Sequence, residues 1–113
     1  MLTLEKLKEY GADVDAGLDI CMKNEDFYLK MVNLLISDNP VDKLKDAINA
    51  GDLDTAFDAA HALKGVAGNL CLTPILEPAK EITELLRVRT QMDYSELVGK
   101  IIKARDALEA LAL

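Results

Sequence analysis

The chain has 113 residues and a formal net charge of −7, and half of its residues are apolar although only two phenylalanines and three tyrosines are aromatic. The acidic balance argues against non-specific nucleic-acid binding, which depends on cationic contacts to phosphate, and against attraction to anionic membranes. With six glycines and three prolines, the composition is typical of an all-α protein, and the length fits a single domain over residues 1–113.

Capping residues and glycines divide the first half of the chain into four predicted helices. The first of two short helices runs from a Thr3 cap to Gly11, and the second covers about 14–22 after a cap at either of two aspartates. Asn24 is expected to cap a third helix. The Asn39-Pro40 pair predicts a fourth, with proline at its first helical position.

Three longer helices are predicted in the second half. Asp52 caps a helix that runs to about Leu70, and Thr73-Pro74 starts the next. Pro78 falls late for a first-turn proline, so this helix either kinks there or begins nearer Glu77.

Asp93 and Glu96 have the spacing of a capping box before the last helix. Because the connections are short, neighbouring long helices are expected to run antiparallel.

The cysteines and the hydropathy pattern indicate a reduced compartment. Cys21 and Cys71 are too few and too far apart for a disulfide scaffold or a metal knuckle, and we expect both to be small core residues. No signal-peptide pattern opens the chain. The longest uncharged run, residues 65–76, is too short to span a bilayer. These patterns predict a soluble, cytoplasmic protein.

His61 is the only histidine and lies in the middle of the helix predicted after Asp52. An α-helix turns about 100° per residue, which places an apolar stripe opposite the imidazole. The predicted core stripe comprises Ala56, Ala59, Leu63, Val66 and Leu70. His61 is therefore expected to face away from the core, and the ordinary alternative is a solvated histidine on a polar face.

Two glycines, Gly65 and Gly68, fall on the same side of this helix as His61. Each is less favourable in a helix interior than alanine by about 1 kcal/mol. That cost is explained if another molecule must approach the backbone beside the imidazole. Gly65, one turn after His61, would remove the side chain most in the way.

The residues around His61 suit phosphoryl transfer. An exposed imidazole is largely uncharged at neutral pH, so one ring nitrogen has a lone pair that can attack an acyl phosphate. Lys64, one turn along, can offset charge on the transferred group; the alternative is a solvated surface lysine. Phe57 is the one large apolar residue on this side and is expected to pack under a neighbouring helix.

Three aspartates precede His61 in the same helix. Asp58 could orient the imidazole through its other ring nitrogen, or it could simply favour the positive end of the helix dipole. For Asp52 and Asp54 the dipole is the preferred interpretation.

The run His61-Ala62-Leu63-Lys64-Gly65 resembles the His-x-Leu-Lys-Gly motif of histidine-containing phosphotransfer domains. The Gly51-Asp52 pair is similar to the Gly-Asp pair that usually leads into the histidine helix of that family. The likeness is sharpest over residues 47–72 and extends more loosely from about residue 14 to the C-terminus. Two positions depart from the pattern. Val66 is bulkier than the small residue common there, and Cys71 stands where the family often has glycine.

The resemblance implies a monomeric, antiparallel up-down-up-down four-helix bundle with short additional N-terminal helices. It also implies that His61 is the phosphoacceptor through the ring nitrogen farther from Cβ, that Lys64 steadies the phosphoryl group and that Gly65 clears space. Phe57, Asp58 and Gly68 are then candidate partner contacts.

The implied partners are receiver domains of hybrid histidine kinases and response regulators in bacterial-type two-component signalling. The receiver would supply the aspartate and Mg²⁺, so the chain needs no cofactor or metal of its own.

Other chemistries have little support in the sequence. There is no Walker or kinase glycine loop and no paired-histidine or Glu-x-x-His ligand set, and no base is apparent for Ser37 or Ser95. We therefore expect a phosphocarrier without an ATP-binding site. The alternatives are a degenerate module that docks a receiver or helical partner without carrying phosphate, and a purely structural helical domain.

Overall fold

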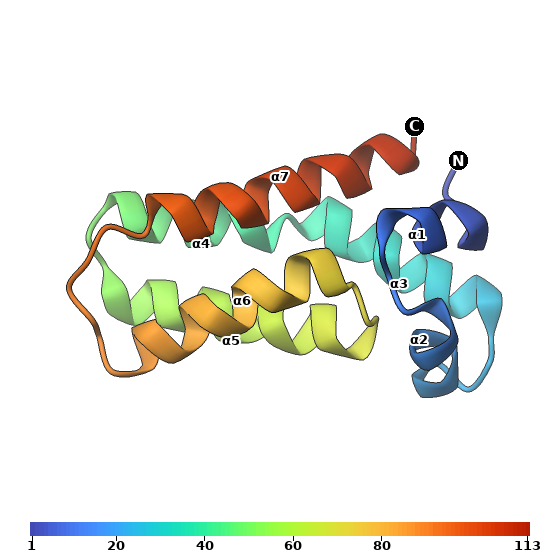
Figure 1. Ribbon diagram of the computed structural model, residues 1–113, viewed down its shortest axis with the longest axis horizontal. Coiled ribbons are helices and arrows are strands. Elements are labelled where there is room, and N and C mark those ends of the chain that lie inside the picture. Colours follow the sequence, from blue (N-terminus) through green and yellow to red (C-terminus); the bar gives the residue numbers. More distant parts are fainter.

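Seven α-helices joined by short turns make up the computed structural model, which describes residues 1–113 (Figure 1). In chain order these are α1 (Leu4–Tyr10), α2 (Val14–Ile20), α3 (Glu25–Asp38), α4 (Pro40–Asn49), α5 (Leu53–Asn69), α6 (Thr73–Arg87) and α7 (Ser95–Leu111). The all-α prediction is confirmed.

Helices α4 to α7 form an antiparallel up-down-up-down bundle, as expected. Helix α5 packs against α4 and α6, and α7 packs against α6 and α4, so α5 and α7 lie diagonally across the bundle. Figure 1 shows α7 and α5 on opposite sides, with α1, α2 and α3 gathered at the end where α5 turns into α6. A backbone hydrogen bond from Asp13 to the Cys71 carbonyl, 2.9 Å long, ties the α1–α2 connection to that turn.

Local capping sets most helix starts where the sequence predicts them. A side-chain oxygen accepts a hydrogen bond from the first turn at four caps, namely Thr3, Asp13, Asn24 and Asp52. Asn39 precedes α4 as predicted, but its side chain makes no cap hydrogen bond. It has φ +52° and bonds instead to Asp42 and to Arg105 of α7. This residue therefore links the α3–α4 break to α7, the last helix of the bundle.

Two sequence-based helix boundaries need correction. Helix α6 begins at Thr73 and continues through Pro78, so the alternative start nearer Glu77 is wrong. The capping box predicted for α7 is also wrong, because Tyr94 occupies the cap position and the Asp93 carboxylate accepts from the Ser95 N–H at 2.9 Å.

Packing explains the α7 boundary. Tyr94 is buried, and its hydroxyl donates to the Thr90 carbonyl at 2.6 Å. These contacts fix the α6–α7 connection up to residue 94, so α7 begins only after it.

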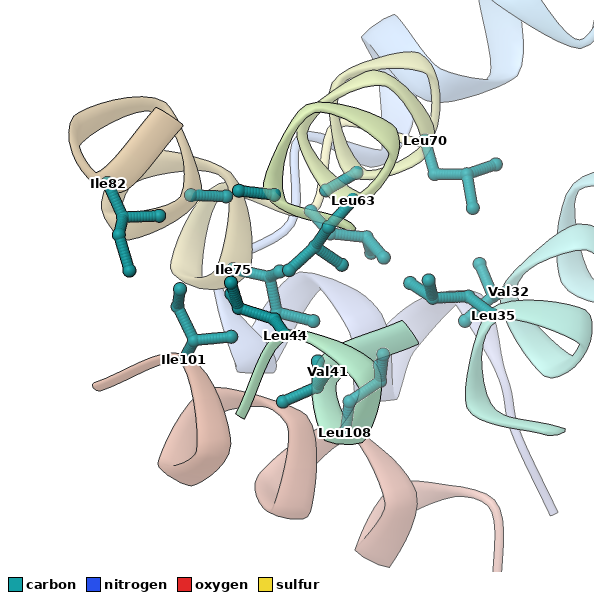
Figure 2. Close-up of a cluster of buried hydrophobic side chains, with 14 of the residues drawn as sticks. Val32, Leu35, Val41, Leu44, Leu63, Leu70, Ile75, Ile82, Ile101 and Leu108 are labelled. Carbon is teal, nitrogen blue, oxygen red and sulfur yellow. The ribbon is translucent and has the colours of Figure 1, made fainter. Parts of the chain in front are cut away.

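The hydrophobic core lies between the four bundle helices and continues under α3. Figure 2 shows side chains from several helices pointing into the same interior. Those that are completely or almost completely buried include Val32, Val41, Leu44, Leu63, Ile75, Ile82, Ile101 and Leu108. None of the seven helices is both long and apolar enough to cross a membrane.

Helix α2 and helix α3 are joined to the bundle through Tyr28. This side chain is fully buried, and its hydroxyl donates to the Leu70 carbonyl at 2.8 Å. Gly17 of α2 lies directly against the ring, because a Cβ there would come within 2.5 Å of Tyr28 Cε1. Both cysteines are free. The core prediction is confirmed for Cys21, whereas Cys71 is only partly buried.

Candidate functional site

His61 lies midway along α5 with its side chain exposed, as the helical arithmetic predicts. The buried face of α5 consists of Ala56, Ala60, Leu63 and Ala67. One member of the predicted stripe is misplaced, because Val66 is 38% exposed. Helix α5 packs against both α4 and α6. Because of this, the helix is rotated so that its alanines are buried and Val66 lies at the edge of the buried face.

Phe57 lies one turn before His61 and stacks on its ring. The ring centroids are 5.7 Å apart and the planes differ by 18°. The guanidinium carbons of Arg87 and Arg89 lie 5.3 and 4.9 Å from the centre of the Phe57 ring. The expectation that Phe57 packs against a neighbouring helix is confirmed, since Arg87 belongs to α6. The stack limits the orientations open to the imidazole while leaving it exposed.

Lys64, one turn after His61, is paired with a residue of α6. Its Nζ lies 3.8 Å from Glu84 Oε1. Glu84 also accepts two hydrogen bonds from Arg87, at 3.1 Å from Nε and 3.3 Å from the terminal nitrogen. The hydrogen bonds and charge of Arg87, with a smaller contribution from Lys64, lower the pKa of Glu84. Glu84 is therefore a carboxylate at neutral pH.

The aspartates of α5 have different partners. Asp52 caps the helix, and the hydroxyl and backbone N–H of Thr55 lower its pKa by hydrogen bonding. Asp54 lies in the first turn, as the dipole interpretation requires, and also forms an ion pair with Arg89 Nε at 2.6 Å. Asp58 is exposed and makes no hydrogen bond to His61, so the structure does not support the orienting role considered for it.

The two glycines beside His61 are not equivalent. Gly65 is exposed, and a Cβ placed there would meet no atom within 4 Å. Gly68 is partly buried, and its Cβ would contact Leu76 of α6 at 3.6 Å. Open space beside the imidazole is therefore a property of Gly65, while Gly68 also belongs to the α5–α6 contact.

A family model for the Hpt domain matches residues 31–112. The chain belongs to the Hpt domain family. No match was found among curated proteins or solved structures. Hpt domains are histidine-containing phosphotransfer modules of two-component phosphorelays, and they are phosphocarriers rather than kinases. They interact with receiver domains. The matched residues begin within α3, so α1 and α2 lie outside the match.

The departure from the Hpt pattern at Cys71 has a backbone explanation. Cys71 follows Leu70, the C-cap residue of α5, and has φ +54°, a left-handed conformation that glycine adopts without strain. Its Sγ is 3.5 Å from the Gly68 carbonyl, and a side chain at this position is accommodated half-buried. The departure therefore concerns the turn between α5 and α6 and leaves the His61 face unchanged.

The other departure, Val66, contributes to an apolar surface next to His61. Val66 and Ala62 of α5 face Met31 and Leu34 of α3 across a shallow groove. Leu34 is 44% exposed. This Hpt domain thus has an apolar strip along one flank of the histidine, which the expectation of a buried Val66 had missed.

Sequence reasoning also missed three charged residues of the Hpt site, namely Glu84, Arg87 and Arg89. Glu84 lies farther along the chain from the α5–α6 turn than its partner Lys64 does. Arg89 and Arg87, in contrast, lie about as far after the turn as Asp54 and Phe57 lie before it. Two antiparallel helices joined by a tight turn produce this register. Folding the sequence back at residues 70–73 would therefore have found the two arginines, but it would not have placed Glu84 opposite Lys64.

Proposed function

We propose that this Hpt domain accepts a phosphoryl group on His61 from an aspartyl phosphate of one receiver domain and passes it to the aspartate of another. The observation that carries the proposal is an exposed histidine at mid-helix, with open space at Gly65 and a lysine one turn away. These features leave the imidazole accessible to a second protein.

The transfer requires only one nucleophile from this chain. The lone pair of His61 Nε2 attacks phosphorus, the P–N bond forms, and the P–O bond breaks with its electron pair leaving on the receiver carboxylate. The proton on Nδ1 stays in place, so the ring becomes a phosphoimidazolium. Onward transfer is the reverse step on a second receiver. Mg²⁺ bound by the receiver would offset charge on the phosphoryl oxygens.

The surface around His61 suits a protein partner. On one flank lies a largely apolar groove that includes Leu34 and Val66 and is edged by Asp38 and Lys43. On the other flank lies the Phe57 stack with its two arginines. Apolar contact beside a few charged groups is the usual composition of a transient interface. We propose that receivers of hybrid histidine kinases and response regulators dock here on a monomer.

Phosphate transfer from a labelled receiver tests the proposal directly. The protein is incubated with a phosphorylated receiver and Mg²⁺, and the acid-labile, alkali-stable label is measured. Wild type should be labelled and His61→Gln should not. Equal labelling of both proteins would refute the assignment of His61.

The docking-only alternative gives a different result. In that case the receiver would bind without labelling the protein, and His61→Gln would bind as well as wild type. Binding can be followed by titration calorimetry with the unphosphorylated receiver. Lack of both label and binding, with every receiver of the same organism, would leave the purely structural alternative.

A further inference from the structure

Lys64 is already engaged before any phosphoryl group arrives. Its Nζ is 3.8 Å from Glu84 Oε1, and its side chain is 34% exposed. Contact between Lys64 and a phosphoryl group on His61 would divide the charge of one ammonium group, which has three N–H donors, between the phosphoryl group and Glu84.

We propose that Glu84 competes with the phosphoryl group on His61 for Lys64 and so limits how strongly the phosphorylated state is held. Glu84 is then a positioning residue that acts through Lys64. The inference rests on the proposed phosphotransfer function and names the residue that adjusts the stability of phosphorylated His61.

The geometry keeps Glu84 in place as a competitor. Arg87 holds the carboxylate through two hydrogen bonds from one turn along α6, at 3.1 and 3.3 Å. Arg87 is itself seated over Phe57, whose ring stacks on His61. The carboxylate is thus fixed by a residue other than Lys64, and it stays available when Lys64 moves.

Exchange between the two acceptors needs little reorganisation. The Glu84 side chain is 60% exposed, and exposed pairs are individually weak. A dianionic phosphoryl group is a stronger acceptor for an ammonium than a solvated carboxylate. The Lys64 ammonium should therefore move toward the phosphoryl group. The weakened ion pair with Glu84 then reduces the free energy that this new contact contributes to the phosphorylated state.

Glu84→Gln, which keeps the shape and removes the charge, isolates this effect. Incubated with a fixed ratio of phosphorylated and unphosphorylated receiver, the variant should shift the equilibrium toward phosphohistidine by about two- to fivefold, the range of an exposed ion pair. Hydrolysis of the isolated phosphohistidine should slow in the same direction.

A matched control lies on the same helix. Glu77 is two turns before Glu84 and pairs with Lys80 at 3.8 Å, the same distance as the Lys64–Glu84 pair. Glu77→Gln should leave the equilibrium unchanged. Both variants should keep the wild-type melting temperature, which separates an effect on phosphate from an effect on the fold.

The decisive comparison repeats Glu84→Gln in a Lys64→Ala background, where the proposed competition no longer exists. There the substitution should have no effect on the equilibrium. A shift of the same size in that background, or no shift in wild type, would overturn the proposal while leaving phosphotransfer intact. Absence of label in wild type itself would overturn the proposed function, and this inference with it.

Discussion

Gly65 and Gly99 offer a direct separation of folding from function. Both lie in the interior of long helices, α5 and α7, and a Cβ at either position would meet nothing within 4 Å. Alanine is favoured over glycine in a helix interior by about 1 kcal/mol. Gly65→Ala and Gly99→Ala should therefore each raise the free energy of unfolding by about 1 kcal/mol, or the melting temperature by roughly 4 °C for a domain of this size.

Phosphotransfer should respond at only one of the two positions. Gly65 is one turn after His61, whereas Gly99 is on α7, diagonally across the bundle. A bulky side chain in a closely fitted contact costs about 1–3 kcal/mol, so Gly65→Gln should slow transfer from a phosphorylated receiver about tenfold or more. Gly99→Gln should transfer at the wild-type rate.

The assay measures the initial rate of label transfer alongside thermal unfolding of the same preparations. Wild-type transfer by Gly65→Gln would refute the argument that the glycine clears space for a partner. A fall in melting temperature for Gly65→Ala would refute the argument that the site is open within this chain. A slow Gly99→Gln would show that the partner covers more of the bundle than the α5 face.

Three further predictions concern the N-terminal half of the protein. Gly17→Ala would place Cβ 2.5 Å from Tyr28 and 2.8 Å from the Leu70 carbonyl, and it should lower the free energy of unfolding by about 1–3 kcal/mol in urea titrations; unchanged stability would contradict this packing. Burial raises the pKa of Tyr28 to about 12, whereas in the unfolded chain it ionises near 10. Stability should therefore fall as the pH rises from about 10 to 12, and Tyr28→Phe should show a smaller fall over that interval. Asn39→Ala removes an acceptor of Arg105 and places alanine at φ +52°, so it should destabilise by about 1–3 kcal/mol. Asn39→Gly, which relieves the backbone strain, should be less affected in the same titration.

Features governed by neighbouring residues could be predicted from the sequence. The caps at Thr3, Asp13, Asn24 and Asp52 depend on a side chain and the backbone three residues away, and such contacts are visible in a short window. The start of α7 could not be predicted in this way. It depends on burial of Tyr94, which is decided by packing between distant segments.

The same distinction between local and long-range contacts applies to the candidate site. The exposure of His61 follows from the period of α5 alone, and the space at Gly65 was expected from the same period. The exposure of Val66 does not follow from this period, because it depends on how α5 is rotated between α4 and α6. The partners of Lys64 and Phe57 come from another helix, and finding them requires the register of the α5–α6 hairpin as well as the motif.

The site and the core use different kinds of interaction, and this difference allows the site to change state without unfolding. The face of α5 that stabilises the bundle is apolar and fully buried at Ala60, Leu63 and Ala67. The opposite face is held by exposed ion pairs, each worth about 1 kcal/mol or less, such as Lys64–Glu84 and Arg89–Asp54. Adding a phosphoryl group to His61 brings up to two negative charges to this exposed face of α5. The lysine and arginine side chains there can exchange their ion-pair partners at a cost smaller than the burial energy of one core leucine. Substitutions among these charged residues should therefore move the phosphorylation equilibrium while leaving the melting temperature nearly constant.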